Sequence, residues 1–355
     1  MGISTLLWQL NANWRENSDM SRKRLAIARL IQLTGANSLL ARGKQPTLLV
    51  FNYHRLKSST QGWSTPFDDG VFGPDVRIFR EQMTWLRVAT RILDEDGLMR
   101  LSEGGEAERG VIYSAVTFDD GYADCHALAK PVLDALGIKG FFFLPFNMIN
   151  ERQLGWWDIA AYLLKNSHRG QFTVDGLEYD IANGALKRIL DYFKLQRAEY
   201  TTSLLKKLAE ACEVDLPSRE VQDRELMTWD QVRDLRIAGH VIGSHTLSHR
   251  VLATLASSEQ STEIKDSRAA LQRELNCEIR SFAYPVGGPQ HVNAESVRLV
   301  REAGYSLAFT FNTGKAMLPL GDRYQIPRES ANSLEILKAK VSLPGVMGLR
   351  EIRVA

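Results

Sequence analysis

The sequence predicts an α/β protein in which helices cover a mainly parallel sheet or barrel. Short apolar runs alternate with segments of helical periodicity on both sides of a long central stretch that lacks this alternation. Glycines follow three of the predicted helices, at Gly137, Gly239 and Gly304, and glycine is a typical C-terminal helix signal. Repeated strand–helix units favour parallel pairing, and in such folds the chemistry lies at the carboxyl ends of the strands.

The individual elements follow from the spacing of apolar residues. The first predicted strand is the run TLLVFNY at residues 47–53. Further strands are expected at residues 112–118, 139–144, 240–244, 280–285 and 306–311. Helices are expected at residues 76–93, 123–136, 228–238, 257–275 and 293–303, the last with Asn293 as its N-cap.

The stretch between the two groups of units is predicted to be a helical insertion, residues 150–225. Its part from 181 to 212 is long, charged and helical in pattern, and no strand is expected to follow until about residue 240. Around it, residues 1–45 are predicted to be a helical lead-in, residues 46–335 the main domain, and residues 336–355 a C-terminal tail.

Composition is ordinary for a soluble globular protein. Of 355 residues, 44% are hydrophobic and 24% charged, which is enough apolar material for a substantial core. The net charge of +2 gives no electrostatic footprint for nucleic acid. Three widely spaced cysteines argue against a disulfide framework and fit a reducing compartment. No run is apolar enough for a transmembrane helix, and residues 1–19 lack the pattern of a secretory signal.

These features predict a cytoplasmic protein. The basic amphipathic segment at residues 22–31 leaves two alternatives open, docking on the parent domain or peripheral contact with an acidic membrane surface. The oligomeric state stays open.

Two consecutive carboxylates, Asp119 and Asp120, follow a predicted strand in the segment TFDDG. Successive side chains of an extended segment point to different sides, so one carboxylate could bind a metal while its neighbour acts as a base. An Asp-Asp-Gly turn at a strand end is the alternative.

His245 and His249 follow another strand. If residue 246 onward is helical, both rings lie on one face and form a metal pair, with Asp120 as the third ligand. A surface or capping histidine pair is the alternative.

Three further sites belong to predicted strand ends or the insertion. His54 ends the first strand and could protonate a leaving group. The alternative is a structural histidine beneath a loop, with its hydrogen bonds satisfied there. The segment Tyr284-Pro285-Val286 leads into two glycines, and its backbone N–H groups could stabilise an oxyanion. Trp157, next to a second tryptophan, could stack on a sugar ring or bury against the inserted helices.

These motifs resemble the polysaccharide deacetylases of the NodB-homology type, carbohydrate esterase family 4. TFDDG resembles the family's first motif, SHTLSH its second, and FAYPVGG a divergent form of its third. The resemblance covers roughly residues 47–146 and 226–330. It implies a distorted (β/α)7 barrel with a helical insertion.

The resemblance also implies roles for individual residues. Asp119 would be the catalytic base, and Asp120, His245 and His249 would bind a divalent metal, zinc or else cobalt, nickel or manganese. Most members carry the acid histidine near the C-terminal end, where this chain has none after residue 291. LVFNYHRL matches a circularly permuted arrangement in which that strand lies at the front, so His54 inherits the acid role.

One position departs from the family pattern. The arginine that usually pairs with the base is replaced by Ala283, and Arg328, at a late strand end, is the candidate replacement. Without a nearby cation, the pKa of Asp119 would be raised.

The predicted function is removal of the N-acetyl group from an N-acetylated sugar in a polysaccharide or glycan precursor by a metal-dependent hydrolase. The alternatives are an amidase or deformylase acting on a lipid-linked or small C–N substrate, and an inactive carbohydrate-binding relative.

Overall fold

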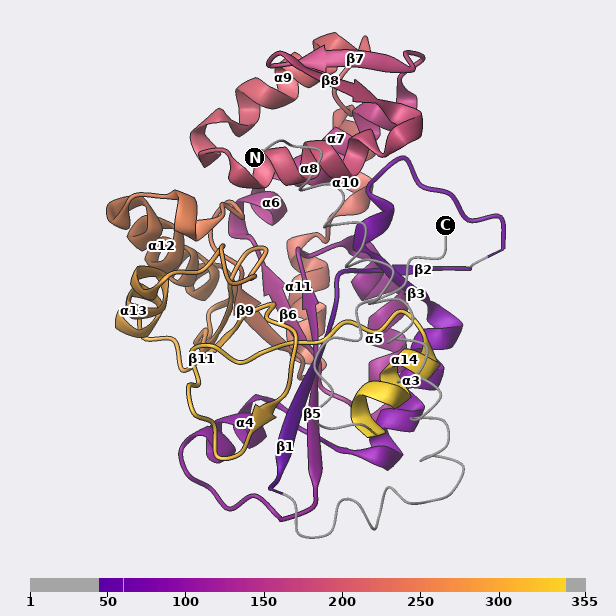
Figure 1. Cartoon of the computed structure of the whole chain (residues 1–355). Coiled ribbons are helices and arrows are strands. Elements are labelled where there is room, and N and C mark those ends of the chain that lie inside the picture. The colour runs from indigo at the N-terminus through magenta and orange to yellow at the C-terminus, as the bar shows by residue number, and fades with distance from the viewer. Residues whose placement is uncertain (1–44, 60, 343–355) are drawn as a thin grey trace, which may run out of the picture.

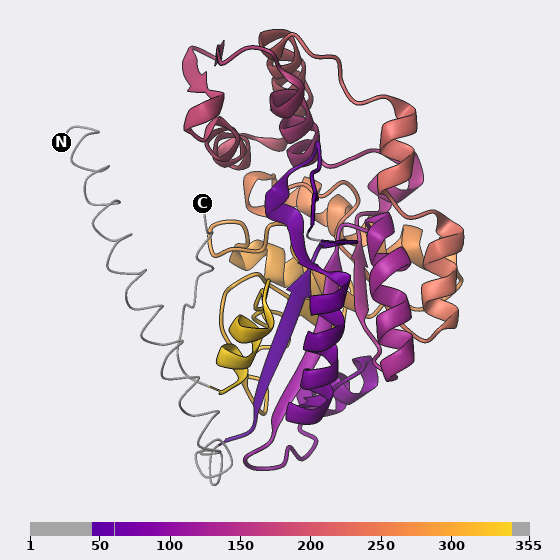
Figure 2. The same cartoon turned by 90° about the vertical axis from the view of Figure 1, so that its right-hand side faces the viewer.

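The computed structural model describes residues 45–59 and 61–342, and Figures 1 and 2 show it from two sides. The predicted lead-in, but for its last residue, lies outside the described residues, as does most of the predicted C-terminal tail. Among the helices described, none is long and apolar enough to cross a membrane.

Six parallel strands form the centre of the molecule, in the order β11-β10-β9-β6-β5-β1. They are β1 (Thr47–Tyr53), β5 (Ile112–Asp119), β6 (Phe141–Leu144), β9 (Val241–Ser244), β10 (Ser281–Ala283) and β11 (Leu307–Phe309). All six were predicted, with ends that differ by up to two residues. Their parallel pairing confirms the α/β fold class.

The gap between the outer strands β11 and β1 is bridged by an irregular segment at residues 326–329. Ile326 forms a parallel bridge with Phe309 of β11, and Glu329 forms one with Phe51 of β1. Backbone hydrogen bonds accompany both bridges, including Glu329 N–H to Val50 O at 2.7 Å. This segment occupies the position of a seventh strand. The sheet therefore curls into a distorted seven-stranded barrel, as the family resemblance implied.

Four short strands flank this barrel. Strand β12 (Ala316–Met317) pairs antiparallel with β1, and β4 (Arg91–Ile92) pairs parallel with the start of β5. The other two, β2 (Arg55–Lys57) and β3 (Phe72–Asp75), pair with each other just after β1.

Helices cover the outside of the barrel, as expected from the alternation of elements. They are α3 (Val76–Ala89), α4 (Glu95–Ser102), α5 (Lys130–Leu136), α11 (Trp229–Ile237), α12 (Ser257–Leu275), α13 (Ala294–Glu302) and α14 (Leu334–Ser342). Asn293 caps α13 as predicted, accepting from the Ser296 N–H at 2.9 Å. A π-helical turn, Cys125–Ala129, precedes α5 where one continuous helix was expected.

Two apolar layers result from the alternation of side chains along the strands. An inner cluster fills the barrel with residues such as Val50, Phe141, Phe143 and Phe309. The larger outer cluster packs the opposite face of the strands against the helices. The barrel interior is therefore largely a packed apolar core, and the predicted site residues gather at its carboxyl end.

The insertion lies above that carboxyl end (Figure 1). Its elements, with the short helix that precedes it, are α6 (Phe146–Glu151), α7 (Trp156–Asn166), β7 (Gln171–Val174), β8 (Leu177–Asp180), α8 (Ala185–Leu195), α9 (Thr201–Cys212) and α10 (Arg219–Glu225). The insertion is mainly helical, as predicted, but it also contains a hairpin that the sequence did not predict: β7 and β8 pair antiparallel and turn at Asp175-Gly176. Both turn residues have positive φ, the signal of a tight hairpin. Nor is the helical stretch continuous, because α8 and α9 are separate helices.

Candidate active site

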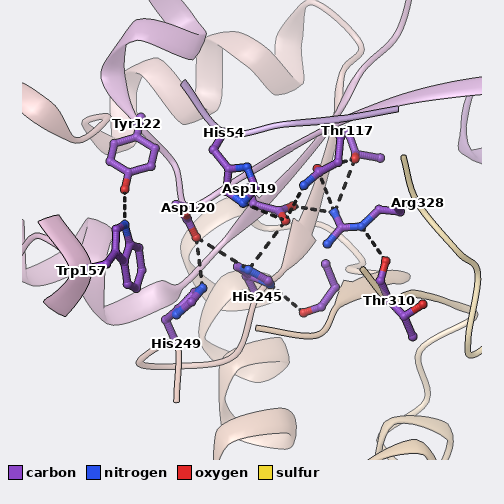
Figure 3. A network of polar contacts seen from close by, with 12 residues as sticks. His54, Thr117, Asp119, Asp120, Tyr122, Trp157, His245, His249, Thr310 and Arg328 are labelled. Atoms are coloured by element: carbon purple, nitrogen blue, oxygen red, sulfur yellow. Dashed lines mark hydrogen bonds and ion pairs between the residues drawn. The ribbon is translucent and has the colours of Figure 1, made fainter. Parts of the chain in front are cut away.

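The predicted site residues converge at the carboxyl end of the barrel (Figure 3). Asp119 ends β5, His54 follows β1, and His245 follows β9. Since β1, β5, β6 and β9 are parallel neighbours, residues far apart in sequence meet at one edge.

Asp119 is the most heavily bonded carboxylate of the site. It is 2% exposed. Its Oδ1 accepts from Arg328 Nη1 at 2.8 Å, and its Oδ2 accepts from Asn52 Nδ2 at 3.1 Å. Burial acts to raise the pKa of this carboxyl, but the charge of Arg328 and, after it, His245 outweighs burial and holds the pKa well below its usual range. Asp119 is therefore an ionised acceptor at neutral pH.

Arg328 supplies the cation that the third motif lacks. Its guanidinium is 1% exposed and lies between the rings of Phe143 and Phe311, at 5.8 and 5.7 Å from their centroids. Its Nε donates to Thr310 O at 2.9 Å, which fixes the group's orientation. A raised pKa was expected for Asp119 only if no cation lay nearby. Because Arg328 is 2.8 Å from its carboxylate, the pKa of Asp119 is lowered instead.

Sequence reasoning missed Asn52. Its amide oxygen accepts from Arg328 Nη1 at 2.9 Å and from Thr117 Oγ1 at 2.7 Å, while its amide nitrogen donates to Asp119. Asn52 thus ties the base and its cation into one network. A signal existed in the sequence. Asn52 is the one amide of this buried strand and lies two residues before His54, and a buried amide needs hydrogen-bond partners.

Asp120, His245 and His249 form a compact, buried group that could hold a metal ion. One ligand atom from each lies within 4.8 Å of the others. Asp120 Oδ1 is 3.2 Å from His249 Nε2 and 3.7 Å from His245 Nε2. This oxygen is buried and has no hydrogen-bond partner among the described residues, and the same is true of His249 Nδ1. Burial acts to raise the pKa of Asp120, but the interaction with His249 outweighs it and the pKa lies below its ordinary value.

His245 is held in the tautomer that a metal ligand requires. Its Nδ1 lies 2.7 Å from Ala283 O, to which it donates, so Nε2 is left with its lone pair facing the carboxylates. Burial is the main cause that lowers the pKa of this imidazole, to about 4. His245 is therefore neutral at neutral pH, as metal binding demands.

The geometry of the histidine pair differs from the prediction. Residues 246–250 form no helix, so the pair does not lie on a helical face. Instead Thr246 and His249 take positive φ, 68° and 56°, and the His249 N–H donates to Thr246 Oγ1 at 3.0 Å. Hydrogen bonds pin the loop from both sides: Asn147 N–H reaches Leu247 O at 2.7 Å, and Ser248 N–H reaches the carboxylate of Glu263 in α12 at 2.9 Å.

Asp120 also departs from extended geometry. Its φ is 72° and that of the following Gly121 is also 72°. A Cβ on Gly121 would lie 2.5 Å from Ile149, so the turn requires glycine. The two carboxylates consequently reach one site through a left-handed turn, and not through strand alternation.

His54 lies at the open side of the site. Its Nε2 is 3.9 Å from Asp119 Oδ2, and its side chain is 30% exposed, against 3% for the aspartate. It is thus the histidine of the site that solvent or a substrate reaches most easily.

Trp157 is buried, which agrees with the second of the two alternatives left open for it. It is 6% exposed, its ring centroid lies 4.4 Å from that of His249, and its Nε1 donates to Tyr122 Oη at 2.7 Å. Tyr122 in turn donates to Asp158 Oδ2 at 2.7 Å. This chain of contacts, which sequence reasoning missed, braces one metal-binding candidate from behind.

The third motif forms a tight turn beside the site. Tyr284 is 1% exposed and its hydroxyl donates to Tyr324 O at 3.0 Å, so its side chain supports the barrel and does not face a substrate. Pro285 is also buried. Val286 is partly exposed and takes a φ of 59°, a strained conformation for a β-branched residue that occurs mostly at functional sites.

Comparison with known families identifies the same class that the motifs indicate. Residues 171–308 match the family model described as polysaccharide deacetylase. The matched segment contains both histidines of the metal-binding candidate and the third motif, while both aspartates, His54 and Arg328 lie outside it. The curated protein YxkH of Bacillus subtilis (strain 168), named as a polysaccharide deacetylase, is 25% identical over 113 residues. That alignment spans 32% of this chain and 39% of YxkH.

Solved structures share the fold over most of the chain. The deacetylase PplD of Streptococcus pyogenes, solved with acetate, has a TM-score of 0.55 at 16% identity, covering 85% of this chain and all of its own. IcaB from Ammonifex degensii has a TM-score of 0.53 at 18% identity, covering 84% of this chain and 99% of its own. At these identities the similarity shows the fold alone, and it agrees with the predicted barrel.

Proposed function

We propose that this chain, which belongs to the polysaccharide deacetylase family, is a metal-dependent hydrolase that removes the acetyl group from an N-acetylated sugar. The sugar would be a unit of a polysaccharide or of a glycan precursor. One observation carries the proposal: three buried metal-binding candidates adjoin an ionised carboxylate, Asp119, that is held by a buried arginine.

The chemistry of the donor set fits a divalent metal. Asp120 offers a buried oxygen without a hydrogen-bond partner, and His245 offers a nitrogen whose tautomer is fixed from behind. Two imidazoles and one carboxylate form a three-ligand set of the kind that holds catalytic zinc or a similar ion. Zinc is our first choice, with cobalt, nickel and manganese as alternatives. When bound, such an ion would supply Lewis-acid chemistry, polarising a carbonyl and lowering the pKa of water.

Asp119 is proposed as the general base. Its low pKa keeps it ionised over the neutral range, and Arg328 and Asn52 hold both of its oxygens in place. It would take the proton of the water that attacks the acetamide carbonyl. The backbone N–H of Val286, in its strained turn, is proposed to donate to the developing oxyanion.

His54 is proposed as the general acid. Two observations support this role: its Nε2 lies 3.9 Å from Asp119 Oδ2, beside the metal-binding candidates, and its side chain is 30% exposed. Its proton would go to the amine nitrogen as the C–N bond breaks, giving acetate and a free amino sugar.

The direct test is a product assay with the zinc-supplemented protein on a panel of N-acetylated saccharides. We expect equal amounts of acetate and new amine, and His54→Gln should lose about 100-fold or more in kcat. His168→Gln, an exposed histidine of the insertion, is the control. Release of formate, or turnover without any fresh amine, would contradict the proposal.

A further inference from the structure

The two histidines of the metal-binding candidate are held in different ways. A backbone carbonyl fixes the His245 ring, whereas the His249 ring packs against Trp157. We propose that Trp157 and Tyr122 are positioning residues, which hold the His249 imidazole so that its Nε2 faces the metal. The inference rests on the proposed function, because it takes Asp120, His245 and His249 as the ligands. It also makes the insertion, whose role the sequence left open, a part of the metal site.

His249 lacks the hydrogen bond that usually orients a metal-binding histidine. Such a histidine commonly donates its second ring nitrogen to a carbonyl or carboxylate, as His245 donates to Ala283 O at 2.7 Å. The Nδ1 of His249 is buried and has no hydrogen-bond partner among the residues that the structure describes. Ring packing is left to orient it, with the centroid of Trp157 at 4.4 Å and that of His245 at 4.8 Å.

The Trp157 ring is itself fixed, so it can act as a rigid support. Its Nε1 donates to Tyr122 Oη at 2.7 Å, and that hydroxyl donates to Asp158 Oδ2 at 2.7 Å. The start of α7 also closes on the indole, since a Cβ on Gly155 would lie 2.3 Å from the ring. The indole therefore cannot turn away from His249 without breaking a buried hydrogen bond, which is costly.

Tyr122 connects this support to a second ligand. It lies two residues after Asp120, beyond the left-handed turn, and the chain is held there because the Met227 N–H donates to Gly121 O at 2.9 Å. Asp120 and His249 follow different strands, yet a route of side-chain contacts joins them. It runs from the turn through the Tyr122 hydroxyl and the indole to the imidazole (Figure 3). The route helps to set how the two ligands face each other, with Asp120 Oδ1 3.2 Å from His249 Nε2.

The same contacts also dock the insertion on the barrel, and the two roles predict different losses. If docking were their only role, weakening them would lower stability, and the folded protein would keep its metal affinity. If they position a ligand, metal affinity falls as well, typically by about 10- to 100-fold when an orienting partner is removed. The metal affinity of the folded protein is therefore the quantity that separates the two roles.

The test measures Zn²⁺ affinity, by competition with a chromophoric chelator, in the wild type, Tyr122→Phe and the control Tyr53→Phe. Tyr122→Phe keeps the ring and removes the acceptor of the Trp157 N–H, so the affinity should fall by about tenfold or more. Tyr53→Phe removes another buried hydroxyl, which donates to Gln82 Oε1 of α3 at 2.9 Å, and should leave the affinity unchanged. The visible absorption spectrum of the Co²⁺ form should change in Tyr122→Phe and stay the same in Tyr53→Phe.

Trp157→Phe tests the second positioning residue, with Trp156→Phe as its control. Trp156 is the preceding residue of α7, and its ring stacks on Phe193 of α8. Trp157→Phe should weaken Zn²⁺ binding, and Trp156→Phe should not. Combining Trp157→Phe with Tyr122→Phe should cost less affinity than the two single losses multiplied, because both remove the same hydrogen bond. Circular dichroism verifies that each variant is folded.

The outcomes separate this inference from the proposed function. Folded Tyr122→Phe and Trp157→Phe variants that bind Zn²⁺ as tightly as the wild type would overturn the inference and leave the proposed function standing. Weaker binding in both variants of a protein that deacetylates no saccharide would support the positioning role and refute the proposed function. A wild type without affinity for Zn²⁺ or Co²⁺ would contradict both.

Discussion

Asp119 and Asp120 are consecutive residues with different neighbours, and this difference separates their proposed roles. Asp119 is bonded through both oxygens to Arg328 and Asn52. Asp120 faces the two imidazoles and keeps one buried oxygen without a hydrogen-bond partner. A left-handed turn at Asp120, followed by a glycine that tolerates no Cβ, brings both groups to one site.

Replacement of Arg328 tests the electrostatic part of this arrangement. Arg328→Gln removes the main cause that lowers the pKa of Asp119 and leaves the opposing effect of burial, so that pKa should rise. The acid limb of the kcat/KM–pH profile should therefore move to higher pH, while Arg328→Lys should move it less. Loss of the buried ion pair should also cost about 3–5 kcal/mol of unfolding free energy.

The control for this experiment is Arg323→Gln, which removes a more exposed arginine paired with Glu103. Circular dichroism at each pH verifies that the Arg328 variants are folded. An acid limb that stays at the wild-type pH in folded Arg328→Gln would show that Arg328 does not set the ionisation of the base.

Among individual residues, the sequence best predicted those that belong to recognisable catalytic or metal-binding motifs. Asp119, Asp120, His245, His249 and His54, found from motifs, and Arg328, proposed as a substitute cation, all lie in one site. Asn52 was missed because the strand pattern was interpreted only for its apolar character. The roles of Tyr284 and Trp157 could not be predicted, because side-chain direction at a strand end or helix start depends on tertiary packing.

At the scale of elements, the strands carry the site because close packing fixes their spacing. In β9, Gly243 lies beside the ring of Phe143 in β6. A Cβ on Gly243 would be 2.5 Å from that ring and 2.9 Å from Ser281 O, so the neighbouring strand leaves no room for a side chain. The position of His245, two residues on, depends on this register.

Gly243→Ala is accordingly expected to destabilise the fold by about 1–3 kcal/mol through overpacking. Chemical denaturation measures the change. Gly170→Ala is the matched control, since its added Cβ meets nothing within 4 Å and its backbone lies outside the glycine-favouring region. A Gly243→Ala variant as stable as Gly170→Ala would mean that the strands separate more easily than their packing indicates.

The elements also show where prediction from sequence ends. Periodicity identified the six parallel strands and the covering helices, because each buries a regular apolar face. It missed the hairpin of β7 and β8, whose exposed, polar residues alternate over only four positions on each side. Nor did it define the loop at 246–250, where a helix was considered as a condition for the histidine pair, and where contacts with α6 and Glu263 accompany left-handed residues instead.

At the scale of the whole molecule, Asp158 connects the insertion to the barrel. This fully buried carboxylate of α7 accepts from Tyr122 of the barrel at 2.7 Å and from the backbone N–H of Asp68 at 3.2 Å. Burial raises the pKa of the Asp158 carboxyl to about 7, against the opposing charge of Arg55. The folded state therefore binds a proton here more tightly than the unfolded chain, in which an aspartate has a pKa of about 3.9.

This difference predicts a pH-dependent stability. The contribution of protonated Asp158 is fully present below about pH 4 and is lost as the pH rises through about 7, by an amount on the order of a few kcal/mol. Asp158→Asn should remove this part of the dependence, because an amide stays neutral and still offers one acceptor and one donor. Thermal unfolding between pH 4 and 8 measures it, with the exposed Asp230→Asn as control. Identical pH profiles for wild type and Asp158→Asn would contradict the prediction.

The most direct test of the proposed function measures metal content and deacetylase activity together, in wild type, Asp119→Asn and His249→Ala. The wild type should hold about one divalent ion per chain, through the three clustered ligands. Asp119→Asn should keep the ion and lose turnover by about 100-fold or more, since it removes the base and leaves the ligands. His249→Ala should lose both. A wild type that binds no ion, or an Asp119→Asn variant that retains most of its activity, would contradict the assignment of ligands and base.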